Sequence, residues 1–210
     1  MITVFLKGAV IMSESRIEPL YPTRPISSEP LRRIRRLAWP LEIAFGVLAG
    51  FATLLLVAVL VMAYVPGNYV TFNASGGWLT LDPSNAPPDA VTVPSLPIVT
   101  QLCGLVAGLA ISGSLILALV SLHRLFGLYR CGIVFSSAAI GCMRRAGYGF
   151  LLFGVLPGAL QPFMRAIGSP DRNWFHAETI PLLLIGSGLV VFSQIIALGV
   201  DLQRENKGFV

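Results

Sequence analysis

Polar side chains inside apolar segments are the residues through which this sequence could perform chemistry. They are Glu42, Gln161, Arg165 and Gln194. Such a group within a membrane is a candidate ligand for a proton, a cation or a transported solute, above all beside a proline-broken helix. Two plainer alternatives exist. Glu42 can form an ion pair with a nearby arginine, and Arg165 can extend its guanidinium to the membrane surface.

Residues for other kinds of chemistry are few and far apart. His123 and His176 are predicted on opposite sides of the membrane, so together they cannot hold a haem or a metal ion. Cys103, Cys131 and Cys142 lack CxxC spacing and predict neither a disulfide nor a zinc site. The sequence has no hydrolase triad order, phosphate-binding loop or dinucleotide fingerprint. We therefore predict a protein that is not an enzyme and binds no cofactor and no metal.

The composition indicates that these residues are positioned by membrane-spanning helices. Of 210 residues, 55% are hydrophobic and 12% charged, and the mean hydropathy is +0.77. Soluble domains usually carry about 25% charged residues. The apolar residues form blocks long enough to cross a hydrocarbon core of about 30 Å. The sequence therefore predicts an all-α, four-helix transmembrane bundle, with spans near residues 37–65, 98–126, 137–164 and 180–200.

The basic residues set the predicted topology. The net charge of +5 would also suit a nucleic-acid-binding protein. However, seven Lys and Arg precede the first span, four lie in residues 123–148, two follow the last span and only two fall on the other side. By the positive-inside rule both termini are cytoplasmic, and we expect no direct contact with nucleic acid. We call residues 123–148, which join the second and third spans, the elbow.

Arginines flank the spans on the predicted cytoplasmic side. We expect them to anchor the spans, and to contact the membrane surface or an acidic partner. They are Arg32, Arg33, Arg35, Arg36, Arg124, Arg130, Arg144 and Arg145.

Proline and glycine mark the segments outside the spans. Residues 1–36 contain four closely spaced prolines and are predicted to form an extended cytoplasmic arm, separate from a membrane domain of residues 37–210. The loop of residues 66–97 has no Lys or Arg, so we place it on the outer side. Within it, residues 69–72 and 78–81 resemble two strands around a turn and predict a small β-hairpin.

Small residues recur every four positions in three of the spans. In lipid this spacing lets two helix backbones approach closely, and it predicts tight packing. The packing residues are Gly46, Gly50, Gly104, Gly108, Ser112, Gly154 and Gly158. Ser136 or Ser137 is predicted to cap the start of the third helix.

Short motifs in the elbow and the tail resemble a known bacterial family. They are LHRLF at residues 122–126, LYRCGIVFS at 128–136, MRRAG at 143–147 and LQRENKGFV at 202–210. With the four-span layout, they make residues 39–210 similar to the membrane proteins called domain of unknown function 2975. The resemblance implies a small multi-pass protein of the bacterial inner membrane. Some members are encoded beside small helix-turn-helix regulators, and the family has no established catalytic residues.

Three functions are compatible with these features. The first is a non-enzymatic accessory or assembly subunit that packs against a larger membrane complex, for example a respiratory or photosynthetic one. The second is a membrane-tethered regulator of a helix-turn-helix transcription factor. The third is a small transporter that uses the polar residues within the spans, together with Gln101. The expected partners are the lipid bilayer and other membrane protein subunits.

Overall fold

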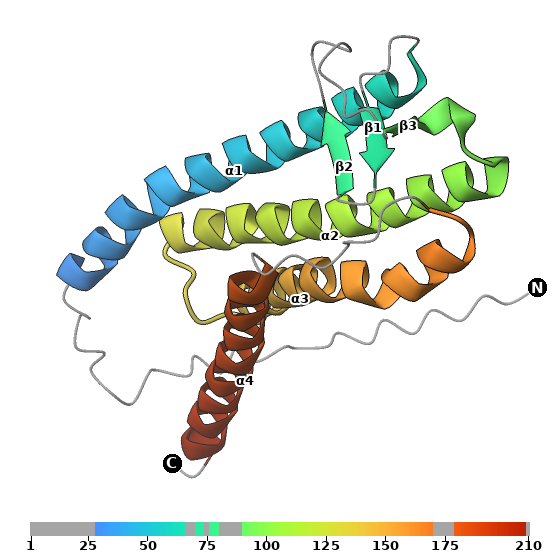
Figure 1. The fold of residues 1–210 in the computed structure, drawn as a ribbon. Coiled ribbons are helices and arrows are strands. Elements are labelled where there is room, and N and C mark those ends of the chain that lie inside the picture. The colour runs from blue at the N-terminus through green and yellow to red at the C-terminus, as the bar shows by residue number, and fades with distance from the viewer. Residues whose placement is uncertain (1–27, 66–69, 74–75, 80–89, 170–178, 209–210) are drawn as a thin grey trace, which may run out of the picture.

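Four long helices make up most of the chain (Figure 1). The computed structural model describes residues 28–65, 70–73, 76–79, 90–169 and 179–208. The helices are α1 (Ser28–Tyr64), α2 (Ile98–Arg130), α3 (Ser137–Ala166) and α4 (Ile180–Gly208). All four are long and apolar enough to cross a membrane, which confirms the prediction of a multi-pass helical protein. Most of the predicted extended arm lies outside the described residues.

The first helix begins earlier than the sequence predicts. It starts at Ser28, so the stretch of four arginines assigned to the arm forms its first turns. Pro30 does not prevent this, because the amides of a first helical turn have no intrahelical acceptor to lose. The leucines and arginines that follow are good helix formers. The last residues of the predicted arm are therefore helical and continue directly into the first predicted span.

The helices pack in chain order. Extensive contacts join α1 to α2, α2 to α3, and α3 to α4. Figure 1 shows the axes of α1, α2 and α3 roughly aligned, with the chain reversing direction from each helix to the next, whereas α4 crosses them. In the most apolar stretches of α2 and α3, 33% of residues are buried, against 6% in α1 and 11% in α4. The helices α2 and α3 therefore form the centre of the protein, and α1 and α4 are its outer helices.

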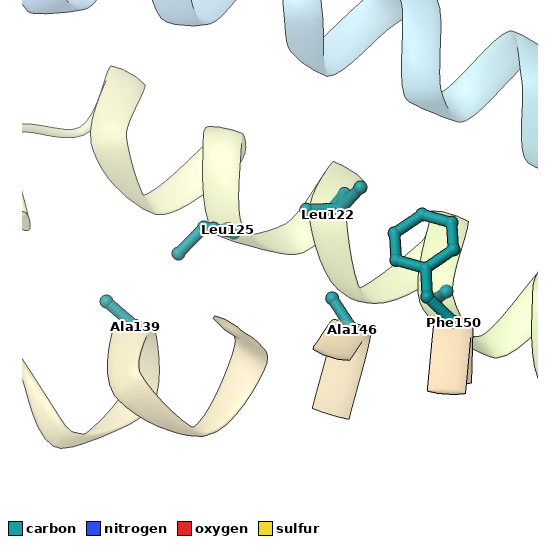
Figure 2. Packing of buried hydrophobic residues seen from close by; sticks show 6 residues of the cluster. Leu122, Leu125, Ala139, Ala146 and Phe150 are labelled. Atoms are coloured by element: carbon teal, nitrogen blue, oxygen red, sulfur yellow. The ribbon is translucent and has the colours of Figure 1, made fainter. Parts of the chain in front are cut away.

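A small-residue contact holds α2 against α3. Leu125 of α2 points toward Ala139 of α3 (Figure 2), and Leu122, Ala146 and Phe150 belong to the same buried cluster. Nearby, a Cβ placed at Gly149 would lie 2.8 Å from the carbonyl oxygen of Ser114. Any larger residue there would force the two helices apart, because backbone cannot move aside as a flexible side chain can.

A second backbone contact joins α3 to α4. A Cβ placed at Gly147 would lie 2.9 Å from the carbonyl oxygen of Gly186, and one placed at Gly186 would lie 2.9 Å from that of Gly147. Farther along the same interface, Gly154 faces the side chain of Leu183. The crossing of α3 and α4 therefore depends on two glycines that meet directly.

Glycine also ends two of the helices. Gly132 follows α2 with φ 81° and Gly168 follows α3 with φ 80°. In each case the amide of the next residue reaches back to a carbonyl in the last turn, from Ile133 to Leu128 and from Ser169 to Met164, both at 3.0 Å. This pattern is the Schellman motif. At the other side of the elbow, the Ser136 hydroxyl accepts a hydrogen bond from the Ala139 amide at 3.1 Å, which confirms the predicted cap.

A small sheet closes one end of the helices. It contains β1 (Val70–Asn73), β2 (Gly76–Leu79) and β3 (Val91–Thr92) in the order β2-β1-β3, with antiparallel pairs. The predicted hairpin is confirmed as β1 and β2, although β3 was not expected. The sheet lies between α1 and α2 (Figure 1), and we call this the sheet end. The opposite end, where α2 meets α3, is the elbow end.

The glycine contact between α3 and α4 makes a testable prediction. We expect Gly186→Ala to destabilise the protein by about 1–3 kcal/mol, because the added methyl overlaps the backbone of α3. Gly188→Ala is the matched control, since a Cβ there meets nothing within 4 Å and alanine favours helix. Thermal unfolding in mild detergent measures both. Equal effects of the two substitutions would contradict the assigned contact.

Candidate functional site

An ion pair links α1 to α2 at the elbow end. Glu42 Oε2 lies 3.2 Å from Arg130 Nε, and the exposed fractions of the two side chains are 14% and 50%. This oxygen is buried and has no hydrogen-bond partner among the described residues, so the attraction is electrostatic without an aligned N–H. The expected pairing of Glu42 with an arginine is thus confirmed. Because Arg130 is half exposed, we attribute only about 0.5–1 kcal/mol to the pair.

His123 makes a second link to the same turn of α1. Its Nδ1 lies 2.9 Å from the carbonyl oxygen of Glu42. A carbonyl can only accept, so this nitrogen carries the proton and donates it. A Cβ placed at Gly46 would lie 3.0 Å from the same nitrogen, so the glycine leaves the space that the imidazole occupies. Phe45 stacks on Phe126 beside it, with ring centroids 5.4 Å apart.

Arg35 makes the third link, at the end of α2. Its Nη2 donates to the carbonyl oxygen of Cys131 at 3.5 Å. It lies over Gly132, where a Cβ would come within 3.0 Å of the guanidinium. A cation suits this position, because the last carbonyls of a helix carry partial negative charge. In all three links a polar side chain lies against a glycine. Arg35 lies against Gly132, His123 against Gly46 and Glu42 against Gly127.

The predicted polar residues do not form one site. Gln161 and Arg165 lie in the last turns of α3, at the sheet end, where the Thr100 hydroxyl donates to the Ile167 carbonyl at 2.7 Å. Glu42 lies at the other end of α2, against Arg130. Gln194 belongs to α4, and its side chain is exposed. A transport path that uses all four residues therefore has no common cavity among the described residues.

The arginines predicted to contact the membrane surface gather at the elbow end. The contacts of Arg35 and Arg130 place the start of α1 beside the end of α2, and Arg144 and Arg145 follow in the early turns of α3. All eight predicted arginines are exposed. The elbow end is therefore strongly basic, which suits contact with anionic headgroups or an acidic surface.

The predicted small-residue positions have different surroundings. Gly46 faces His123, and Gly154 faces Leu183, whereas a Cβ at Gly50 or Gly108 would meet nothing within 4 Å. Gly104, Gly108 and Ser112 line an apolar cavity. The face of α2 that packs against α3 is a different one: Ser114 and Ala118 lie against Gly149 of α3, and Ala107 lines a cavity shared with α3.

Two glycines at which helix backbones meet, Gly147 and Gly149, are not among the predicted packing residues, whereas Gly154 is. Ala146, Gly147 and Gly149 form a dense run of small residues in α3. On α2 the signal was a spacing of seven and four, from Ala107 to Ser114 to Ala118, instead of uniform steps of four. Heptad-like spacing of small residues keeps one face of a helix toward its neighbour.

Two apolar cavities flank α2 near the sheet end. One, of about 230 Å³, lies between α1 and α2 under the sheet. The other, of about 320 Å³, lies between α2 and α3 and is lined by residues such as Leu102 and Leu156. Met164 lines both cavities and is itself buried. Among the described residues, no group of three or more His, Cys, Asp or Glu could hold a metal ion.

The ion pair can be tested by a double-mutant cycle. We expect Glu42→Gln and Arg130→Gln to be coupled by about 0.5–1 kcal/mol in unfolding free energy, and the coupling to fall as salt increases. Arg124→Gln is the control partner, because that exposed arginine forms no ion pair with the described residues. Additive effects of Glu42→Gln and Arg130→Gln would show that the pair contributes nothing.

Comparisons with family models, curated proteins and solved structures found no match to this chain. Its function is therefore inferred from the chemistry and geometry of its own residues.

Proposed function

We propose that this protein is a non-enzymatic subunit of the bacterial cytoplasmic membrane that associates with other membrane-spanning chains through its outer helices. Its role would be that of an accessory or assembly subunit of a larger membrane complex. The observation that carries this proposal is the position of Gln194 on the outer helix α4.

Gln194 lies well inside the apolar segment Ile180–Leu202, away from both of its ends. Its side chain is exposed and has no hydrogen-bond partner among the described residues. Burying an amide in hydrocarbon without a partner costs roughly 2 kcal/mol or more, and glutamine is too short to reach the membrane surface from there. A neighbouring transmembrane helix that hydrogen-bonds this amide recovers part of that free energy.

The apolar neighbours of Gln194 extend the same surface. Val191 and Leu198, which lie one turn before and after Gln194 on the same face of α4, are 56% and 64% exposed. Apolar exposure alone is what lipid requires, so these residues suit either lipid or protein. The amide distinguishes the two, because lipid tails offer no hydrogen-bonding group.

The other outer helix has a feature of the same kind. Gly50 of α1 is exposed, and a Cβ there would meet nothing within 4 Å. Glycine lowers helix stability by about 1 kcal/mol relative to alanine, and no close contact with a described residue requires it here. A close approach by a second helix would explain why glycine occupies position 50, since small residues are the usual contact points of membrane helices.

The alternatives receive less support. The polar residues of the transporter hypothesis are separated, and Glu42 is already paired with Arg130. The regulator hypothesis rests on the family resemblance and on the basic elbow end, which anchoring in the membrane also explains.

Crosslinking from α4 tests the proposal. A photoreactive phenylalanine analogue incorporated in place of Gln194 should give a discrete protein adduct in native membranes. The same analogue in place of Leu184, which is 70% exposed on the same helix, is the control. A protein that gives no protein adduct from either position, and that purifies only as a monomer in mild detergent, would exclude the assembly role.

The proposed topology has its own test. With both termini cytoplasmic, the elbow is cytoplasmic and the sheet end faces outward. Cys131 is exposed in the elbow, and Ser95 is exposed at the sheet end. In a chain whose other cysteines are replaced, Ser95→Cys should react with a membrane-impermeant maleimide in spheroplasts, and Cys131 only after permeabilisation. The reverse pattern would show the opposite orientation.

A further inference from the structure

The cavity between α1 and α2 has no part in the proposed assembly through the outer helix faces. It measures about 230 Å³ and is partly open to the surface. Its walls come from both membrane-spanning helices, and Val70 and Phe72 of β1 contribute to its lining at the sheet end.

The cavity exists because α2 has glycines, which have no side chain to fill the space, in the cavity wall. Gly104 and Gly108 lie in its wall, and a Cβ at Gly108 would meet nothing within 4 Å. The three links at the elbow end hold α1 against α2 there, whereas at the sheet end the strands lie between the two helices (Figure 1). The helices therefore cannot close over the glycines.

The shape of the cavity is elongated along the helices. Its lining extends along α2 from Thr100 to Ser112, which is about 18 Å at 1.5 Å per residue, and along α1 from Leu56 to Tyr64, about 12 Å. A space that extends this far along the helices fits a linear chain better than a compact ring system. It also runs in the direction that acyl chains take beside transmembrane helices.

The chemistry of the lining favours hydrocarbon. Nearly all of it is apolar, and its two most polar side chains are engaged within the protein. The Gln101 amide donates to the Leu96 carbonyl at 2.8 Å, and the Thr100 hydroxyl donates to the Ile167 carbonyl at 2.7 Å. The hydroxyl-bearing residues Tyr64, Ser112 and Ser169 also line the cavity, so a polar ligand would exchange most of its hydration for few hydrogen-bonding groups.

We propose that this cavity is a binding site for one acyl chain of a membrane phospholipid, which enters from the bilayer between α1 and α2. An empty apolar space leaves its lining without van der Waals partners. Smaller apolar cavities, of about 150 Å³, bind hydrocarbons as simple as benzene. The bilayer supplies acyl chains at very high local concentration, so mass action favours an occupied site.

Photolabelling tests the site directly. The full-length protein is placed in nanodiscs of phosphatidylethanolamine and phosphatidylglycerol that contain a phosphatidylcholine with a diazirine on one acyl chain. After illumination, mass spectrometry of peptides should find label on Leu60 and Leu105 several-fold above the label on Phe51 and Leu54, which face lipid on the outside of α1. Equal labelling of all four, or no labelling of the cavity residues, would overturn the proposal.

Two substitutions separate the cavity from the general lipid surface. Gly108→Leu should fill the cavity and lower the labelling of Leu60 and Leu105 at least fivefold. Gly113→Leu adds the same side chain to α2 outside the cavity and should leave this labelling unchanged. Ser112→Leu fills the cavity from the next turn and serves if Gly108→Leu does not fold. Unchanged cavity labelling in a folded filled variant would refute an acyl chain at this site.

A second measurement does not depend on the label. In detergent, added phospholipid should raise the thermal unfolding midpoint of the unmodified protein more than that of Gly108→Leu, because only the former has space to fill. The same response in both proteins would count against the site.

Discussion

The direct meeting of helix backbones at glycine is the constraint on which the rest of this structure depends. Gly149 brings α3 onto Ser114 of α2, and Gly147 meets Gly186 of α4. Water does not drive helices together inside a membrane, so van der Waals contact between closely packed backbones must do so. Gly147 and Gly149 belong to α3, and Gly186 of α4 packs against α3. The helix α3 therefore positions both of its neighbours.

Most buried serine hydroxyls of the helices are hydrogen-bonded within their own helix. The hydroxyls of Ser114, Ser121 and Ser193 donate to carbonyls three or four residues earlier in their own helices, at 2.7 Å. They behave as small residues whose polarity is satisfied locally. Between helices, the described polar links of α1 gather at the elbow end, where Arg35, Glu42 and His123 each face a glycine. Gln194 departs from this pattern, and that departure is the reason to expect a partner at α4.

Local patterns predicted much of the fold. The four apolar blocks, the hairpin, the Ser136 cap and the pairing of Glu42 with an elbow arginine all follow from residues close together in sequence or from charge near a span end. The sequence could not show which face of α2 meets α3, because Gly104 and Ala107 look equally suitable until α3 is in place. The start of α1 and the strand β3 were missed because a proline in a first turn and a two-residue strand carry weak local signals.

The packing of helices in chain order has a consequence for how the protein is made. Each helix after α1 has its main contacts with the helix synthesised just before it. Each newly inserted span can therefore pack at once against a helix that is already in the membrane. Contacts between neighbours in sequence form early, and they leave little apolar surface waiting for a distant segment. The outer helices α1 and α4, each with one helix neighbour, are then the two left most available for another chain.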